Sequence, residues 1–188
     1  MLFKESDSLE EIWQVVKHEL HRGALDAKHP FHWVNLGTHG ADFPEIRKVV
    51  LRKITDTFHF LIFTDYRSQK VKELKTNPKA SLHFYHPKKQ VQVRVRANTK
   101  IHFKNDFSEE FWLSISESRR KEYLGKYSPG TFIPDHEEGW ERLDDVNHFF
   151  TVLEFIPLEI EVLQLSRNGH LRILFSSKKE WEGNWLVP

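Results

Sequence analysis

The stretch that most constrains the fold is "QVQVRVRANTKIHF", residues 90–103, in which apolar and polar side chains alternate. In an extended chain Val91, Val93 and Val95 point to one side, and the polar residues between them point to the other. A period of two does not suit a helix, but it suits a strand with one face in a core and the other in water. The sequence therefore predicts a sheet with one buried face and one solvent-exposed face.

Shorter runs rich in β-branched and aromatic residues lie on both sides of this stretch. They span residues 31–38, 46–54, 58–64, 80–86, 149–165 and 170–177, and Pro157 is expected to split the fifth run into two strands. Six to eight strands with few helices favour a mainly β fold, a largely antiparallel β-barrel with peripheral helices.

The first of the expected helices covers residues 9–23. Its apolar residues recur at helical spacing, Ser8 and Glu11 are placed as a capping box, and Gly23 is expected to end it. Another helix should run from Ser68 to the Asn-Pro pair at 77–78, because a proline disfavours helical geometry in the residue before it.

The composition is that of one folded domain over residues 1–188, with 39% apolar residues. Lys and Arg number 28 against 27 acidic residues, so no overall field attracts nucleic acid or a membrane surface, and we expect neither partner. The chain has no cysteine, and no apolar run approaches the ~20 residues that span a bilayer. We expect a cytoplasmic protein.

The segment "TDYRSQK", residues 64–70, places a positive charge where a helix begins. If Ser68 caps that helix, the free amide groups of its first turn favour an anion, and Ser68 and Lys70 add direct contacts. Strand alternation lets Arg47 reach the same side. A phosphate site and an ordinary capped helix with a lysine near its start both remain open on spacing alone.

Four motifs together resemble one family. "RKVVLR" at 47–52, "FTDYRSQK" at 63–70, "NPKASLHF" at 77–84 and "QVRVRA" at 92–97 are similar in order and distance to the pyridoxamine 5'-phosphate oxidase family. The resemblance extends from about Phe31 to Ala97, then weakly from Phe149 onward. It implies an FMN-binding split β-barrel that forms a homodimer, with two flavin sites at the subunit interface.

The resemblance also implies which residues bind FMN. By position they are Arg47, Val49, Leu51, Arg52, Phe63, Thr64, Ser68, Gln69, Lys70, Gln92 and Arg172. Gln69 replaces an arginine in the family's Ser-Arg-Lys phosphate turn, which removes one cationic group. Gln92 matches a glutamine that hydrogen-bonds the isoalloxazine ring, with Gln90 on the same face as the alternative. Arg172 matches an arginine that contacts flavin across the interface.

The C-terminal part departs from the family pattern. Leu163 stands where a flavin-stacking tryptophan would be, and the Arg-X-His pair for the substrate phosphate is absent. His170 aligns with the family's substrate histidine after a one-residue gap, and it is the candidate proton donor or acceptor. On the substrate side the chain offers Trp112, Ser116 and Arg120.

We therefore expect an FMN-dependent oxidoreductase that transfers a hydride from an unidentified small molecule to flavin. The alternative is a non-catalytic flavin-binding protein or a haem-handling relative of the same barrel. The loop at 128–139 is open to three interpretations, as a lid, a dimer arm or a mobile segment. Trp181 and Trp185 are expected to pack the C-terminal strand against the barrel or a second subunit.

Twelve histidines raise the question of a metal site. Three pairs are spaced by three residues: His18/His21, His29/His32 and His83/His86. Two ligands do not make a site, and on a strand this spacing sends the pair to opposite faces. We predict no metal.

Overall fold

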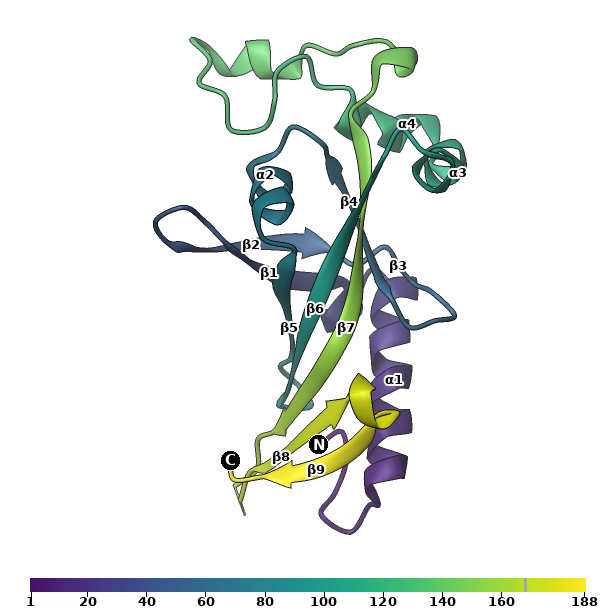
Figure 1. Ribbon diagram of the computed structural model, residues 1–188, viewed down its shortest axis with the longest axis vertical. Coiled ribbons are helices and arrows are strands. Elements are labelled where there is room, and N and C mark those ends of the chain that lie inside the picture. Colours follow the sequence, from purple (N-terminus) through teal and green to yellow (C-terminus); the bar gives the residue numbers. More distant parts are fainter. Residues whose placement is uncertain (168) are drawn as a thin grey trace.

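The alternating stretch forms a central strand of a long, curled antiparallel sheet in the computed structural model, which describes residues 1–167 and 169–188 (Figure 1). The strands are β1 Trp33–His39, β2 Pro44–Val50, β3 Lys53–Ile54, β4 Phe60–Asp65, β5 Lys79–His86, β6 Val91–Phe103, β7 Phe150–Gln164, β8 Leu171–Ser176 and β9 Glu182–Leu186. Their order is β2-β1-β5-β6-β7-β4-β3, with β8 and β9 continuing from β7. The predicted mainly β, antiparallel fold is confirmed.

The helices and short 3-10 turns flank the sheet. They are α1 Leu9–Leu25, α2 Gln69–Thr76, α3 Asp106–Ser114 and α4 Glu117–Arg120, with short 3-10 turns at Pro30–His32, Lys121–Tyr123, His136–Trp140, Asp145–Asn147 and Ser177–Lys179. In Figure 1, α2 lies near the upper end of β5, while β8, β9 and both chain termini lie at the lower end. Among the described helices, none combines the length and apolar character that a membrane-spanning helix needs.

The two faces of the sheet differ as the alternation predicts. On the inner face Val91, Val93 and Val95 are fully buried in the main core. The outer face carries polar side chains from successive strands, such as Arg94 and Glu161, whose charged groups are 2.5 Å apart.

Helix α1 covers the inner face and begins at the predicted capping box, in which Ser8 and Glu11 exchange hydrogen bonds. Trp13 packs on Trp181 with ring centroids 5.0 Å apart, which confirms that Trp181 packs the C-terminal strand against the barrel. Trp185 does not follow this expectation in the single chain, because it is 46% exposed.

Gly23 does not end the helix, which continues to Leu25. A Cβ on Gly23 would lie 2.6 Å from Phe31 Cβ. Glycine at this position therefore allows Phe31 to pack closely against α1. The prediction that Gly23 ends α1 was wrong.

Strand β7 is continuous, whereas the run at 149–165 was predicted to form two strands. Arg96 pairs with Glu159 and Ala97 pairs with Pro157, so the register shifts and Leu158 is an extra residue in β7. Such a bulge leaves room for a proline, which has no N–H to donate to the ladder. The strand therefore continues through Pro157.

Candidate functional site

A polar cluster forms where β4 turns into α2. Ser68 occupies the N-cap position with extended backbone, as predicted, and is 1% exposed. Its hydroxyl makes no capping bond to the helix and lies 3.4 Å from the Thr64 hydroxyl. The amide groups of the first turn of α2 are therefore not capped by Ser68, and such groups favour an anion.

Lys70 points into this cluster, and its ammonium group donates to Thr64 Oγ1 at 3.1 Å. Burial lowers the pKa of Lys70, and the positive charge of Arg47 lowers it further, while Asp65 and Glu73 act in the opposite direction. Two partly buried cations thus lie near each other. An anion placed between them would offset both the burial and the mutual repulsion.

Arg47 enters the cluster from β2. Its Nη2 donates to Glu73 Oε2 at 2.9 Å, and its Nη1 donates to the Thr38 hydroxyl. That hydroxyl in turn donates to Glu73 Oε2 at 2.5 Å. The structure therefore brings together four of the predicted flavin-binding residues: Arg47, Thr64, Ser68 and Lys70.

Sequence reasoning missed Thr38 and Glu73 as members of the cluster. A signal for Glu73 is present in the sequence, because it lies on α2 between the apolar residues Val71 and Leu74, and all three are buried. An acidic residue on the buried side of a short helix requires a partner of opposite charge.

Five other predicted residues lie apart from the cluster: Val49, Leu51, Arg52, Phe63 and Gln69. The side chains of the first two are buried in the core, and Gln69 is exposed. Arg52 lies 3.8 Å from the Glu122 carboxylate. Phe63 packs on the ring of Phe150, with centroids 5.0 Å apart.

The remaining flavin-binding candidates form a row on the outer face. Gln92 of β6 pairs with Leu163 of β7, which pairs with Arg172 of β8. The Arg172 guanidinium lies 3.0 Å from Glu161. Gln90 is not part of this face, because it precedes β6 in a left-handed conformation with φ 52°. Gln92 is therefore the strand residue of the two.

His170 directly precedes β8 in the chain. Strand β8 lies at the other end of the molecule from α2 (Figure 1). Its side chain is exposed, and its Nδ1 accepts the Ser166 amide at 3.2 Å. Within one chain His170 is therefore remote from Lys70.

The three candidates on the substrate side, Trp112, Ser116 and Arg120, have local structural roles. Trp112 stacks on His148 with centroids 4.1 Å apart, and Arg120 lies over the Trp112 ring at 5.0 Å. Ser116 is the N-cap of α4. Burial lowers the pKa of His148, partly opposed by Glu109.

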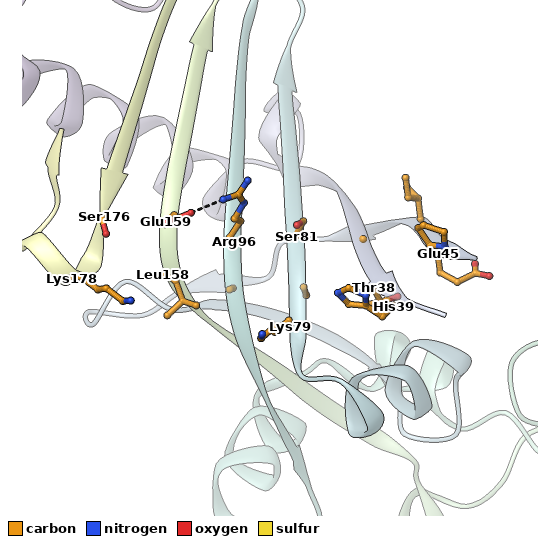
Figure 2. A pocket seen from close by; sticks show the side chains of 15 residues that line it. Thr38, His39, Glu45, Lys79, Ser81, Arg96, Leu158, Glu159, Ser176 and Lys178 are labelled. Carbon is orange, nitrogen blue, oxygen red and sulfur yellow. Dashed lines mark hydrogen bonds and ion pairs between the residues drawn. The ribbon is translucent and has the colours of Figure 1, made fainter. Parts of the chain in front are cut away.

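A groove of about 580 Å³ crosses the outer face from β1 and β2 to β8. Figure 2 shows Ser81, Arg96, Glu159 and Ser176 on successive strands along it. Thr38 and Glu45 line the other end, and both also contact Arg47. The groove therefore reaches the polar cluster, although the predicted flavin-binding residues do not line it.

One group of potential metal ligands occurs among the described residues: Glu19, His29 and His86. The Nδ1 atoms of His29 and His86 each accept a backbone N–H, so each neutral ring carries its proton on Nε2. Lys89 Nζ lies 2.7 Å from Glu19. Protonated nitrogens and an ammonium group suit a hydrogen-bonded ion pair and not a metal ion.

Comparison with known proteins decides the family. The model of the "Pyridoxamine 5'-phosphate oxidase, FMN-binding domain" matches residues 10–103, half of the chain. This chain belongs to that family. Its family resemblance is thereby confirmed, and FMN is its cofactor.

Relatives in the pyridoxamine 5'-phosphate oxidase family support the assignment at low identity. A probable pyridoxamine 5'-phosphate oxidase of Schizosaccharomyces pombe is 29% identical over 192 residues, covering 91% of this chain and 80% of the relative. A pyridoxine/pyridoxamine 5'-phosphate oxidase of Pelagibacter ubique is 28% identical over 170 residues, covering 77% and 74%.

Two solved structures show that the fold is shared with known proteins. A pyridoxamine 5'-phosphate oxidase-related, FMN binding protein of Nostoc punctiforme has a TM-score of 0.75 and 21% identity, covering 93% of this chain and 96% of its own. PhzG of Burkholderia lata, solved with tetrahydrophenazine-1-carboxylic acid, has a TM-score of 0.75 and 18% identity, covering 100% and 98%.

Proposed function

We propose that the protein is an FMN-dependent oxidoreductase, and that the cluster at the start of α2 binds the phosphate of the cofactor. The observation that carries this proposal is that Lys70 and Arg47, which is held by Glu73, lie beside the first turns of a helix whose N-cap side chain makes no capping bond. These groups fit a phosphate, which accepts charge-assisted hydrogen bonds from cations and amides.

Each residue of the cluster has a defined task in this proposal. Lys70 and Arg47 neutralise the phosphate, the Ser68 hydroxyl donates to it, and Thr64 orients Lys70 through its 3.1 Å hydrogen bond. Bound FMN supplies the hydride acceptor of the reaction, which no amino-acid side chain provides. The protein itself binds the cofactor and orients it.

The separation of the candidate residues supports a homodimer. The polar cluster is on the inner face, whereas the row formed by Gln92 and Arg172 is on the outer face. One chain does not present both groups to one flavin, but a second copy packed on the outer face brings its own row to the groove, which reaches the cluster at Thr38 and Glu45. This face also exposes Trp33, Ile46 and Tyr85, by 53%, 73% and 42%.

The substrate in this proposal is a small organic molecule that gives up a hydride. Leu163 and the missing Arg-X-His pair remove a ring contact and a phosphate contact that the family pattern supplies, so we expect little or no oxidation of pyridoxamine 5'-phosphate. The same departures favour the second candidate, a flavin-binding protein without oxidase activity. Location in the cytoplasm stays a prediction, supported by the lack of cysteine.

The phosphate site is tested by comparing FMN with riboflavin. The double variant Arg47→Ala/Lys70→Ala should bind FMN at least about 100-fold more weakly than wild type, while riboflavin affinity changes little, because only charge-assisted phosphate bonds are lost. Quenching of flavin fluorescence measures both constants. Lys72→Ala, an exposed lysine of the same helix, is the matched control. Equal losses for both flavins would place the phosphate elsewhere.

The activity is tested separately on the protein loaded with FMN. Anaerobic mixing with a candidate reductant such as pyridoxamine 5'-phosphate should bleach the flavin band if hydride transfer occurs, and air should restore it. A protein that binds FMN but is reduced by none of a panel of small amines and alcohols would favour the non-catalytic candidate.

A further inference from the structure

Glu73 is a buried acid beside the two cations of the polar cluster. It is 5% exposed, and its Oε2 accepts hydrogen bonds from Arg47 and Thr38 at 2.9 and 2.5 Å. Its Oε1 is buried without a hydrogen-bond partner among the described residues. A carboxylate here opposes the binding of an anion, so its presence requires a reason.

Arg47 has two possible acidic partners in the structure. Glu73 holds it from α2, the helix that carries Lys70. Glu45, two residues before Arg47 on the same face of β2, lies 3.7 Å away and is half-exposed at the end of the groove. The bond to Glu73 therefore keeps the guanidinium on the α2 side. The guanidinium has more N–H donors than the bonds to Thr38 and Glu73 use.

The charges in the cluster also constrain the role of Glu73. Asp65 is paired with Arg67 at 2.7 Å and the Glu45 side chain is 47% exposed, so the buried and partly buried charges that remain are those of Arg47, Lys70 and Glu73, which sum to one positive charge. A phosphate monoester carries about −1.5 to −2 near pH 7. The carboxylate thus lowers the affinity for phosphate even as it orients Arg47.

We infer that Glu73 is a positioning residue, which holds Arg47 toward the start of α2 for the cofactor phosphate and limits the affinity through its charge. This inference rests on the proposed function. The two effects separate chemically, because glutamine keeps an acceptor oxygen for Arg47 and Thr38 but has no charge, whereas alanine removes both.

The test compares Glu73→Gln with Glu73→Ala in FMN and riboflavin titrations. We expect Glu73→Gln to bind FMN about threefold more tightly than wild type and Glu73→Ala to bind it about threefold more weakly, a difference of roughly tenfold between them. Riboflavin affinity should differ less than about twofold between the variants, because it has no phosphate. Thermal unfolding with and without flavin shows which variants are folded.

A double-mutant cycle separates positioning from a purely structural role. If Glu73 acts through Arg47 as well as through its charge, Glu73→Ala should no longer weaken FMN binding in an Arg47→Ala background but should tighten it about threefold, which is the effect of the charge alone. This double variant also removes both charges, which avoids leaving a buried charge unpaired.

The outcomes distinguish the two claims. If wild type shows no preference for FMN over riboflavin, the proposed function fails and this inference fails with it. If that preference is present, but Glu73→Gln and Glu73→Ala bind FMN alike or shift riboflavin by the same factor as FMN, only the inference is wrong. If only one of the two Glu73 variants folds, the inference is decided by the double-mutant cycle that combines this variant with Arg47→Ala.

Discussion

At the scale of single residues, Glu19 is a buried carboxylate surrounded by basic groups. Lys89 Nζ lies at 2.7 Å, and His29 Nε2 and Arg22 Nη1 both lie at 3.1 Å. Burial alone would raise the pKa of Glu19, but the hydrogen bonds from Lys89 and His29 outweigh it and lower the pKa to about 2. This carboxylate therefore ties α1 to the turn before β6.

We predict that this carboxylate makes the protein sensitive to acid. The ordinary glutamate pKa is 4.5, and the folded value is about 2, so the unfolded chain binds the proton first. The stabilisation is complete above about pH 5 and is lost as the pH falls toward 2. Between about pH 5 and pH 3, wild type should lose roughly 2 kcal/mol more unfolding free energy than Glu19→Gln, by urea denaturation.

The control for this measurement is Glu10→Gln. Glu10 is an exposed carboxylate on the same helix, so its variant should keep the full wild-type response to acid. Parallel curves of unfolding free energy against pH for wild type and Glu19→Gln would contradict the prediction.

At the scale of elements, the structure around Gly23 in α1 predicts a stability change opposite to the one that helix propensity alone predicts. Alanine is favoured over glycine in a helix by about 1 kcal/mol. Here, however, a Cβ would lie 2.6 Å from Phe31 Cβ and 2.9 Å from the Phe31 carbonyl carbon. The backbone of Phe31 cannot yield cheaply, so Gly23→Ala should lower the unfolding free energy by about 1–3 kcal/mol, measured by chemical denaturation.

His18→Ala serves as the comparison for Gly23→Ala. This residue is on the same helix with a side chain 71% exposed, so propensity acts there without a clash, and the variant should be as stable as wild type or slightly more so. A stabilising effect of Gly23→Ala would show that α1 and Phe31 separate without cost.

The elements themselves were largely predictable, because local patterns determine them. The alternation in β6 and the boundaries of α2 at Ser68 and Asn77 follow from spacing and from Pro78. The continuation of β7 through Pro157 was not predictable, since it depends on a bulge that arises only when β6 pairs with it.

At the scale of the whole molecule, the polar cluster also was predictable from the sequence only in part. The sequence identifies Arg47 and Lys70 through motifs, each within one local segment. It does not identify the bond between Arg47 and Glu73, because that contact joins β2 to α2 and depends on how the helix packs. The meeting of Glu19, His29 and His86 from three elements is hidden for the same reason.

The proposed homodimer gives the last prediction, on the association of two chains through the outer face. Ile46 lies on this face and is 73% exposed in the single chain. In a symmetric dimer Ile46→Glu places a charge at the interface twice, so the dimer dissociation constant should rise by at least about 100-fold. Sedimentation at micromolar concentration should then show the 22.5 kDa monomer where wild type shows twice that mass.

Leu25→Glu is the matched control, because Leu25 is 87% exposed at the end of α1, the helix that covers the inner face, and its variant should remain dimeric. If the row of Gln92 and Arg172 completes the flavin site of the other copy, Ile46→Glu should weaken FMN and riboflavin together, because ring contacts are lost while the phosphate cluster stays intact. Lys70→Ala, in contrast, should weaken the binding of FMN and leave the binding of riboflavin nearly unchanged. A monomeric Ile46→Glu that binds both flavins like wild type would show that one chain holds the cofactor unaided.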